Sequence, residues 1–471
     1  MTETVETVKT ADAAEAQPQS NYTEGNFARV TEEVTAFDLE VIGEIPAAFE
    51  GRYLRNGPNP VVPTDPATSH WFTGTGMVHG VRLRDGRAEW YRNRWVRGHE
   101  VTELFGEPAV PGPTRGLDFS PNTSVGGYAG TTWALVEAGA LPAELGYELD
   151  TVCRNDFFGS LQTGFTAHPK VDPATGEMHA ICYAWQDLLD HIEYVVIGTD
   201  GRVRKTVDIP LPGMSMIHDM SLTENYAVVY DLPVTVDLDI VLSGKSSFPF
   251  RWDPGYGARI GLLPRDGTAD EIIWSDVGLC YVFHPLNAYE DSDGRVVIDL
   301  CRYDKMFDRD LLGPAGDSSP TLDRWIIDPT TRQVTEERVD DRFHEFPQVR
   351  GDRAARKHRF GYTVGVGDGL IGGANYKVDY DTGIAVFHDH GPGRGSGEAV
   401  FVVDPEGTAE DDGWLISFVY DETTDGSELV ILDASDLSRS PVARVPLPQR
   451  VPYGFHGNWV PDEAVAPPET T

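Results

Sequence analysis

The sequence has no run of 18 or more apolar residues and few cationic residues, and both shortages exclude a class of protein. A helix that spans a bilayer needs about 20 mostly apolar residues, so we expect no transmembrane helix. Lys and Arg number 38 against 75 Asp and Glu, which gives a net charge of −37. Because this charge repels phosphate groups, we expect no nucleic-acid partner and at most transient contact with a membrane.

Cysteine is also scarce. Cys153, Cys182, Cys280 and Cys301 lie far apart and form no CxxC motif. Cys182 and Cys301 lie in apolar runs, which is typical of reduced, buried thiols. The N-terminal sequence MTETVETVKT has neither the basic start nor the apolar core of a signal peptide. We therefore expect a cytoplasmic protein.

Several common catalytic motifs are missing as well. The sequence contains no HExxH, no GxSxG and no GxxxxGK[ST], so these motifs give no support for a zincin, an α/β-hydrolase or a P-loop enzyme. The chemistry must be sought in residues that lie far apart in the sequence.

Turn-forming residues are abundant. Gly 49 and Pro 33 make up about 17% of the chain, and Asp-Gly occurs seven times. Asp-Gly favours tight hairpins, and several pairs lie between alternating apolar runs. The pattern predicts an all-β fold: a sandwich, a barrel or a propeller, of which a propeller holds so many strands most easily. Helical periodicity is confined to short candidates near Ala143–Leu149 and Lys305–Leu312.

The texture of the sequence is uniform between two polar ends. Residues 1–22 are rich in Thr, Glu, Ala and Gln, and we interpret them as a disordered acidic tail. Residues 463–471 are interpreted as a second, flexible tail. No linker divides residues 23–462, which predicts a single domain.

Four of the 13 histidines share a local setting. Each follows apolar or small residues and is followed by Pro, Asp or Gly, which ends a strand. If four different strand ends deliver these imidazoles, they can meet on the axis of a propeller. The four are His168 in FTAHPK, His218 in MIHDM, His284 in VFHPL and His456 in YGFHGNW.

Longer motifs resemble the carotenoid cleavage oxygenase family in the same order, from about Asn26 to Val460. They include GRYLRNGPNP at 51–60, GMVHGVRL at 76–83, ALVEAG at 134–139, FPFRWDPGYGARIGLLPR at 248–265 and RVPYGFHGNWV at 450–460. The family contains carotenoid, apocarotenoid and stilbene dioxygenases and a retinoid isomerohydrolase, and this chain is similar to its bacterial members. The resemblance implies a seven-bladed β-propeller with a short helical and loop cap over an axial metal site.

The resemblance also implies one Fe²⁺ per subunit, held by His168, His218, His284 and His456. Neutral imidazole is a suitable ligand for Fe²⁺. Three glutamates of the family, here Glu137, Glu345 and Glu398, would each accept the second N–H of one ligand histidine. Thr123 matches a position beside the open side of the iron in some bacterial relatives. Its alternative interpretation is a turn former.

Three functions are weighed. The first is oxidative cleavage of a C=C bond of a carotenoid or apocarotenoid by O₂, which gives two carbonyl products. The second is the same reaction on a stilbene or isoeugenol, and the third is a metal-free propeller that acts as a binding scaffold. Stilbene-cleaving relatives carry a phenol-binding Lys directly before the first glutamate, where this chain has Val136. An apolar residue there favours a small apolar polyene as the substrate. The double bond, an isomerase variant and the oligomeric state remain open.

Overall fold

Hairpins closed by glycine-containing turns build most of the structure. The computed structural model describes residues 22–66, 69–116, 118–184, 187–243, 248–314, 316–366 and 372–466. Strands β4 (Gly76–Arg84) and β5 (Arg87–Trp95) are joined by Asp85 and Gly86, both with positive φ. Asp-Gly pairs favour this tight turn because Gly has no Cβ and Asp tolerates the left-handed region.

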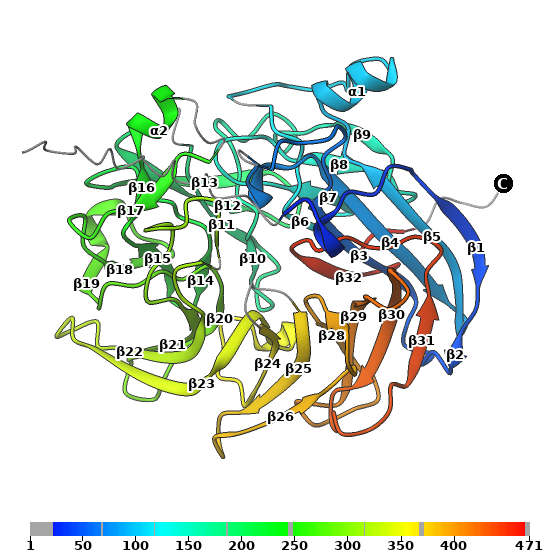
Figure 1. Ribbon diagram of the computed structural model, residues 1–471. Coiled ribbons are helices and arrows are strands. Elements are labelled where there is room, and N and C mark those ends of the chain that lie inside the picture. Colours follow the sequence, from blue (N-terminus) through cyan, green and yellow to red (C-terminus); the bar gives the residue numbers. More distant parts are fainter. Residues whose placement is uncertain are drawn as a thin grey trace, which may run out of the picture.

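The antiparallel sheets follow one another around a common centre, as a propeller does (Figure 1). Within the described residues they form seven blades. The first blade consists of β6 (Ser124–Tyr128), β7 (Thr131–Leu135), β8 (Ala143–Leu145) and β9 (Thr151–Arg154). The second consists of β10 (Lys170–Val171), β11 (Met178–Cys182), β12 (His191–Ile197) and β13 (Val203–Pro210). The third consists of β14 (Met220–Leu222), β15 (Tyr226–Asp231), β18 (Arg259–Pro264) and β19 (Ile273–Asp276).

The fourth and fifth blades share one strand. The first part of β23 (Val334–Gln348) pairs with β22, and its last residues, from His344, pair with β24. This strand joins the two blades into one seven-stranded sheet. Its other members are β20 (Pro285–Glu290), β21 (Val296–Arg302), β22 (Thr321–Ile327), β24 (Phe360–Val366), β25 (Gly372–Asp379) and β26 (Ile384–His388).

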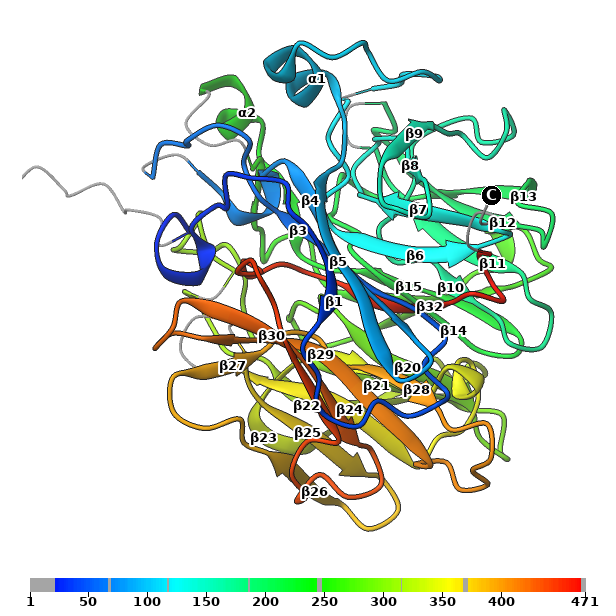
Figure 2. The same cartoon turned by 90° about the vertical axis from the view of Figure 1, so that its right-hand side faces the viewer.

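The two ends of the chain close the ring. Strands β1 (Thr35–Leu39) and β2 (Ile42–Gly43) add to the outer edges of neighbouring blades, while the C-terminal β32 (Gly457–Pro461) pairs with β3 (Gly51–Pro58). In this last blade the strand order is β1-β5-β4-β3-β32, so β32 lies beside β3 near the centre and β1 lies at the opposite, outer edge (Figure 1 and Figure 2). The sixth blade, which β2 completes, contains β27 (Arg394–Ser396), β28 (Val400–Val403), β29 (Gly413–Asp421), β30 (Gly426–Asp433) and β31 (Ala443–Pro446).

Burial follows the position of a strand within its blade. Every residue of β11 is buried, whereas in β13, at the outer edge of the same blade, exposed residues alternate with half-buried ones and with the buried Ile209. A strand that is covered on both faces needs a continuous apolar run, and an edge strand needs apolar residues only on its inner face. The largest core cluster packs β11, β12, β14, β15, β18 and β21 against one another.

Short elements form a cap on one side of the propeller. Helices α1 (His99–Phe105) and α2 (Leu238–Ser243) lie on the same side in both views, with the hairpin of β16 (Val234–Val236) and β17 (Phe250–Trp252) near α2. Four single-turn 3₁₀ elements are η1 (Gly25–Phe27), η2 (Trp71–Thr73), η3 (Ala269–Glu271) and η4 (Gly351–Arg353). No helix in these described ranges is long and apolar enough to cross a membrane.

Both helical segments predicted from the sequence are wrong. Residues Ala143–Leu145 form strand β8, and residues 305–312 are turns and bends. Residues 143–154 form the outer hairpin of a blade, so pairing with β7 overrides a weak local preference for helix.

The predicted tails, 1–22 and 463–471, lie mostly outside the described residues. Tyr22 and residues 463–466 are described, and two of these residues pack against the domain. The ring of Tyr22 stacks on Trp71, and Val465 is buried in a core cluster with Val460. The packed part of the chain therefore includes both residues.

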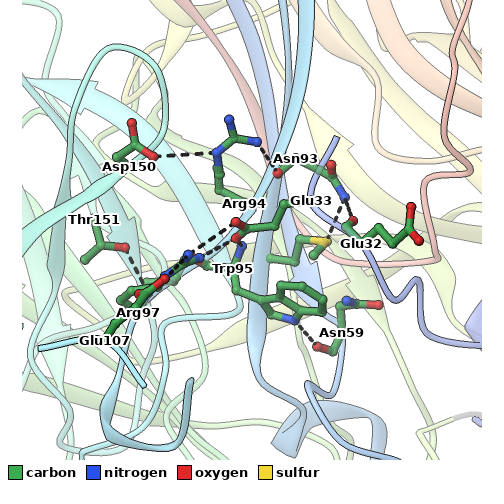
Figure 3. A network of polar contacts seen from close by, with 12 residues as sticks. Glu32, Glu33, Asn59, Asn93, Arg94, Trp95, Arg97, Glu107, Asp150 and Thr151 are labelled. Atoms are coloured by element: carbon green, nitrogen blue, oxygen red, sulfur yellow. Dashed lines mark hydrogen bonds and ion pairs between the residues drawn. The ribbon is translucent and has the colours of Figure 1, made fainter. Parts of the chain in front are cut away.

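Arg97 ties α1 to the propeller (Figure 3). Its guanidinium binds Glu107, which follows the helix, with Nε–Oε2 at 2.9 Å and Nη2–Oε1 at 3.0 Å. It also binds Glu33 of the N-terminal segment, with Nη2–Oε2 at 3.2 Å, and its backbone N–H donates to Thr151 Oγ1. This one residue thus joins the cap and the N-terminal segment through its side chain, and strand β9 through its backbone.

We predict that Arg97→Gln loosens the cap without unfolding the propeller. Loss of two carboxylate partners should lower the free energy of unfolding by about 1–2 kcal/mol, since both pairs are only partly buried. Amide hydrogen exchange should accelerate in residues 99–107.

The effect of this variant should depend on pH. The hydrogen bond from Arg97 lowers the pKa of Glu107 below its ordinary value of 4.5. A carboxylate with a lowered pKa stabilises the fold above its ordinary pKa and loses that effect as the pH falls through the lowered value. The difference between wild type and variant should therefore shrink below about pH 4.5. An equal difference at pH 3.5 and pH 7 would contradict this role for Glu107.

Candidate metal centre

Each of the four singled-out histidines lies one or two residues before the first residue of an inner strand. These strands are β10, β14, β20 and β32, whose labels surround the centre of the ring in Figure 1. The Pro, Asp or Gly that follows each histidine therefore marks a strand start, whereas the sequence analysis expected a strand end. The four blades still deliver four imidazoles to one place.

The four rings face one another across a small space. Ring centroids of His168 lie 4.4 Å from His218 and 4.5 Å from His456, and those of His284 and His456 are 4.8 Å apart. One ligand nitrogen from each ring lies within 4.8 Å of all the others. The four residues are only 7–9% exposed.

Three carboxylates define which nitrogen faces the centre. Glu137 Oε1 lies 2.9 Å from His218 Nδ1, Glu345 Oε2 lies 2.5 Å from His284 Nδ1, and Glu398 Oε1 lies 3.0 Å from His456 Nδ1. An ionised carboxylate only accepts hydrogen bonds, so each Nδ1 carries the proton and donates it. The Nε2 atom of each neutral ring then presents a lone pair.

These lone pairs point at one another. His218 Nε2 and His284 Nε2 are 3.1 Å apart, and His168 Nε2 is buried without a hydrogen-bond partner among the described residues. Two acceptors at this distance repel unless a cation or a proton lies between them. The arrangement is that of a cation site built from neutral nitrogen donors.

Two of the glutamates are themselves held by further donors. Glu345 accepts from the Tyr303 hydroxyl at 2.8 Å and from the backbone N–H of Phe346. Glu398 accepts from Gln348 Nε2 and from the backbone N–H of Gly457, each at 2.8 Å. The donors Tyr303, Gln348 and Gly457 were not found from the sequence, although Gln348 is only three residues beyond Glu345.

The surroundings of most ligand groups shift their pKa values toward the protonation state that binds a metal. Burial, followed by the neighbouring imidazoles, holds the pKa of His168 well below its ordinary value, and burial also lowers the pKa of His284. Burial opposes protonation of His218 as well, but Glu137 raises the pKa of that imidazole above its usual value. Burial would raise the pKa of Glu345, yet His284 and the other donors hold it low. A metal that needs neutral imidazole and ionised carboxylates finds both.

The backbone is strained directly after two of the glutamates. Ala138 follows Glu137 with φ +66°, and Phe346 follows Glu345 with φ +49°. Residues other than Gly rarely adopt this region, and the strain is of order 1–3 kcal/mol each. At Phe346 the turn places the aromatic ring 5.5 Å from His284 in a stacked arrangement.

A cavity of about 450 Å³ opens onto the histidines from the side of the cap. His218, His284 and His456 form part of its wall, while His168 lines a second cleft of about 300 Å³, which His456 also reaches. Most of the cavity wall is apolar, and much of it is aromatic: Trp71, Phe72, Phe119, Tyr183, Phe248, Phe250, Phe283, Tyr303, Phe346 and Phe455.

Thr123 and Val136 both line this cavity. Thr123 is 7% exposed; its hydroxyl donates to Asn122 Oδ1, and its carbonyl accepts the backbone N–H of His456. Val136 and Glu137 both reach the cavity because β7 ends at Leu135 and the alternation of a strand no longer applies. The structure thus brings together all nine predicted site residues.

Comparison with known proteins identifies the relatives of this arrangement. Residues 27–461 match the family model described as "Retinal pigment epithelial membrane protein". The chain belongs to this family. A relative from Mycobacterium tuberculosis, named carotenoid cleavage oxygenase, is 47% identical over 96% of this chain and 99% of its own length.

Solved structures of the family have the same fold. Cobalt-substituted Synechocystis apocarotenoid oxygenase is 28% identical, with a TM-score of 0.82 over 92% of this chain and 97% of the other. Pseudomonas brassicacearum lignostilbene dioxygenase is 26% identical, with a TM-score of 0.85 over 95% and 100%. The fold of this family member is therefore the propeller that the sequence resemblance implied.

The donor set fits the metal that the family resemblance implies. Four neutral imidazoles, three of them held by carboxylates, suit a divalent first-row metal such as Fe²⁺. A second group of candidate ligands, His191, Glu193 and Asp208, lies on β12 and β13. There His191 bonds to Asp190 and Glu193 to Thr163, so the group has local partners of its own.

We predict that His168→Ala, His218→Ala, His284→Ala and His456→Ala each lower metal occupancy and abolish activity. Each variant removes one of four nitrogen donors from a site with few ligands. Glu345→Gln should be milder, with a loss of about 10–100-fold in affinity or activity, because its histidine remains in place. Metal content per chain and activity are the measurements.

His179→Ala is the matched control. His179 is also a buried histidine of the blade that contains His168, but its ring bonds to Tyr194 and does not belong to the four-histidine group. Full metal occupancy and activity in any one of the four ligand variants would remove that histidine from the assignment. A loss in Glu345→Gln as large as in His284→Ala would contradict a supporting role for the glutamate.

Proposed function

We propose that the protein is an Fe²⁺-dependent dioxygenase that cleaves one C=C bond of a carotenoid or apocarotenoid with O₂. One double bond and one O₂ give two carbonyl products. The observation that carries the proposal is the set of buried imidazoles at the end of a deep apolar cavity. When bound, Fe²⁺ would supply O₂ activation, which no protein side chain provides.

The chain's own residues would bind and orient the substrate. The cavity offers aromatic rings above and beside the three histidines in its wall, and a polyene has few polar groups to lose on entering it. Burial of apolar surface contributes roughly 25 cal/mol per Å². The same wall excludes water from the reacting carbons. Glu137, Glu345 and Glu398 keep the imidazoles turned toward the centre.

The residues of the cavity wall next to Glu137 favour a polyene over a phenol as the substrate. Val136 can neither donate a hydrogen bond to a phenolate nor balance its charge. Tyr183 lies nearby, but burial, and then the carboxylate of Glu137, raise the pKa of its phenol well above the usual value. This tyrosine therefore stays neutral and adds no positive charge that could balance a phenolate. The relative that is a lignostilbene dioxygenase shares the fold, so the substrates must be compared directly.

The test is aerobic competition between an apocarotenal and resveratrol on the Fe²⁺-loaded protein, with products identified by mass. We expect the apocarotenal to be turned over faster. Val136→Thr keeps the shape but adds a hydroxyl, and it should raise KM for the apocarotenal roughly fivefold, since an unpaired buried hydroxyl costs about 1 kcal/mol or more.

Val152→Thr serves as the control, because Val152 is 48% exposed on β9 and should change nothing. Faster turnover of resveratrol would reject the polyene proposal. Absence of turnover of both substrates in an iron-replete protein would favour another substrate class. A protein that stays free of metal and inactive after Fe²⁺ loading would favour the binding scaffold.

We further propose that the cap makes transient contact with membranes, in which long polyenes dissolve. Exposed apolar side chains gather on α1, α2 and the loop after α1, and both helices contribute to the cavity wall. Leu104, Phe119, Leu238 and Leu242 are 39–84% exposed. Stable anchoring is opposed by the net charge of −37, which repels anionic lipids.

We predict that wild-type protein binds weakly and reversibly to vesicles of phosphatidylcholine and that Leu242→Ser lowers this binding severalfold. Leu242 is 84% exposed on α2, so its replacement should not affect folding. Ile384→Ser is the control, because Ile384 is 60% exposed on β26, on the side opposite the cap in both views. Equal loss in the two variants, or binding that survives washing, would contradict a transient contact through the cap.

We also propose one Fe²⁺ per subunit, a cytoplasmic location and the absence of a nucleic-acid partner. One Fe²⁺ per subunit follows from the single four-histidine group in the described residues. A cytoplasmic location is supported by four cysteines that are all unpaired. The acidic surface supports the absence of a nucleic-acid partner.

A further inference from the structure

The fourth histidine also faces a carboxylate. His168 Nδ1 lies 3.6 Å from Asp219 Oδ2, so its Nε2 points toward the centre as in the other three rings. This distance exceeds a hydrogen bond but is within the range of an ion pair. His168 therefore has the same orientation as its neighbours, with a more distant carboxylate.

Asp219 is buried and already bound. Its side chain is 3% exposed, Lys170 Nζ lies 2.8 Å from Oδ1, and the backbone N–H of Met220 donates to the same oxygen. Lys170 also reaches Oδ2 at 2.9 Å. Glu345 and Glu398 differ from Asp219, because their hydrogen bonds other than those to the histidines come from neutral donors.

Asp219 and Lys170 lie next to two of the ligand histidines in the sequence. Asp219 directly follows His218, and Lys170 is the second residue after His168 and the first residue of β10. The ion pair therefore joins the segments that carry two different histidines. Its position couples the orientation of His168 to that of the neighbouring blade.

We propose that Asp219 is a positioning residue for His168, and that Lys170 weakens its pull by sharing its charge, so that His168 is the least firmly held of the four ligands. This inference rests on the proposed metal site and concerns neither the substrate nor O₂. A carboxylate beside Nδ1–H fixes the ring and makes its Nε2 a better donor. A cation on the same carboxylate reduces that effect.

The two partners should therefore act in opposite directions. Asp219→Asn removes the charge and should weaken Co²⁺ binding about tenfold, the lower end for residues that support a ligand. Lys170→Met leaves the full charge of Asp219 to His168 and should tighten Co²⁺ binding severalfold. Affinity is measured by competition with a chelator, and the visible absorption bands of bound Co²⁺ should shift in Asp219→Asn.

The double variant separates the carboxylate from the cation. Asp219→Asn also leaves the charge of Lys170 without its partner, and that charge alone could repel a metal. If Asp219 positions His168, the double variant stays weaker than wild type. Recovery of wild-type affinity in the double variant would overturn the proposal, and so would equal losses in the two single variants.

Two further variants keep the outcome interpretable. Asp231 is a buried carboxylate in the same blade as Asp219, and its partners are Ser215, Tyr256 and Arg259. Asp231→Asn removes that buried charge and should leave the Co²⁺ affinity and the absorption bands unchanged. Lys170→Arg keeps the charge and should behave like wild type. If Asp219→Asn does not fold, weaker Co²⁺ binding in Lys170→Met alone overturns the proposal. Because Co²⁺ binding needs no substrate, failure of the oxygenase assays would leave this result intact.

Discussion

The structure depends on the convergence of four neutral imidazoles that belong to four different blades. His168, His218 and His284 come from consecutive blades, but His456 precedes the last strand of the chain. That strand, β32, pairs with β3 from the N-terminal part of the sequence. The metal centre is therefore complete only when the ring is closed, and closure joins residues about 400 positions apart. This requirement explains why the N-terminal β1 and β2 brace the outer edges of the two blades beside the junction.

Burial of charge is the second constraint. Glu345 and Glu398 are 2–3% exposed, and an isolated carboxylate in such a position would be strongly destabilising. Each is compensated by an imidazole N–H and by further donors, which fixes the ring and its proton together. The strained backbone at Ala138 and Phe346 has the same origin, since both residues follow a glutamate that must point inward. The site is thus stabilised by the rest of the propeller rather than by its own local structure.

The sequence itself predicted the histidine candidates and many hairpins, because each has a short-range signal, whereas the three glutamates came from the family resemblance. Asp85-Gly86 marks the β4–β5 turn, and each ligand histidine ends an apolar run before Pro, Asp or Gly. The number of blades came from the family resemblance alone, since the blades share no repeated motif. Long-range contacts had no signal. Tyr303, which follows β21, reaches Glu345 on β23 although β22 lies between these two strands in the sheet, and β23 serves two blades; no local pattern shows either feature. The false helix at 143–149 has the same cause, because pairing with β7 decides its structure.

The four ligands do not experience the same surroundings. His218, His284 and His456 face the apolar cavity, and each has a glutamate within 3.0 Å. His168 faces the opposite cleft, whose wall also contains Lys170, Gln348 and Asn458. A substrate in the cavity would therefore press against the firmly held ligands, while the more polar side of the centre carries the ligand with the weaker support. His456 lines the cleft as well as the cavity, so the two environments meet at this ligand, and its support by Glu398 has to serve both.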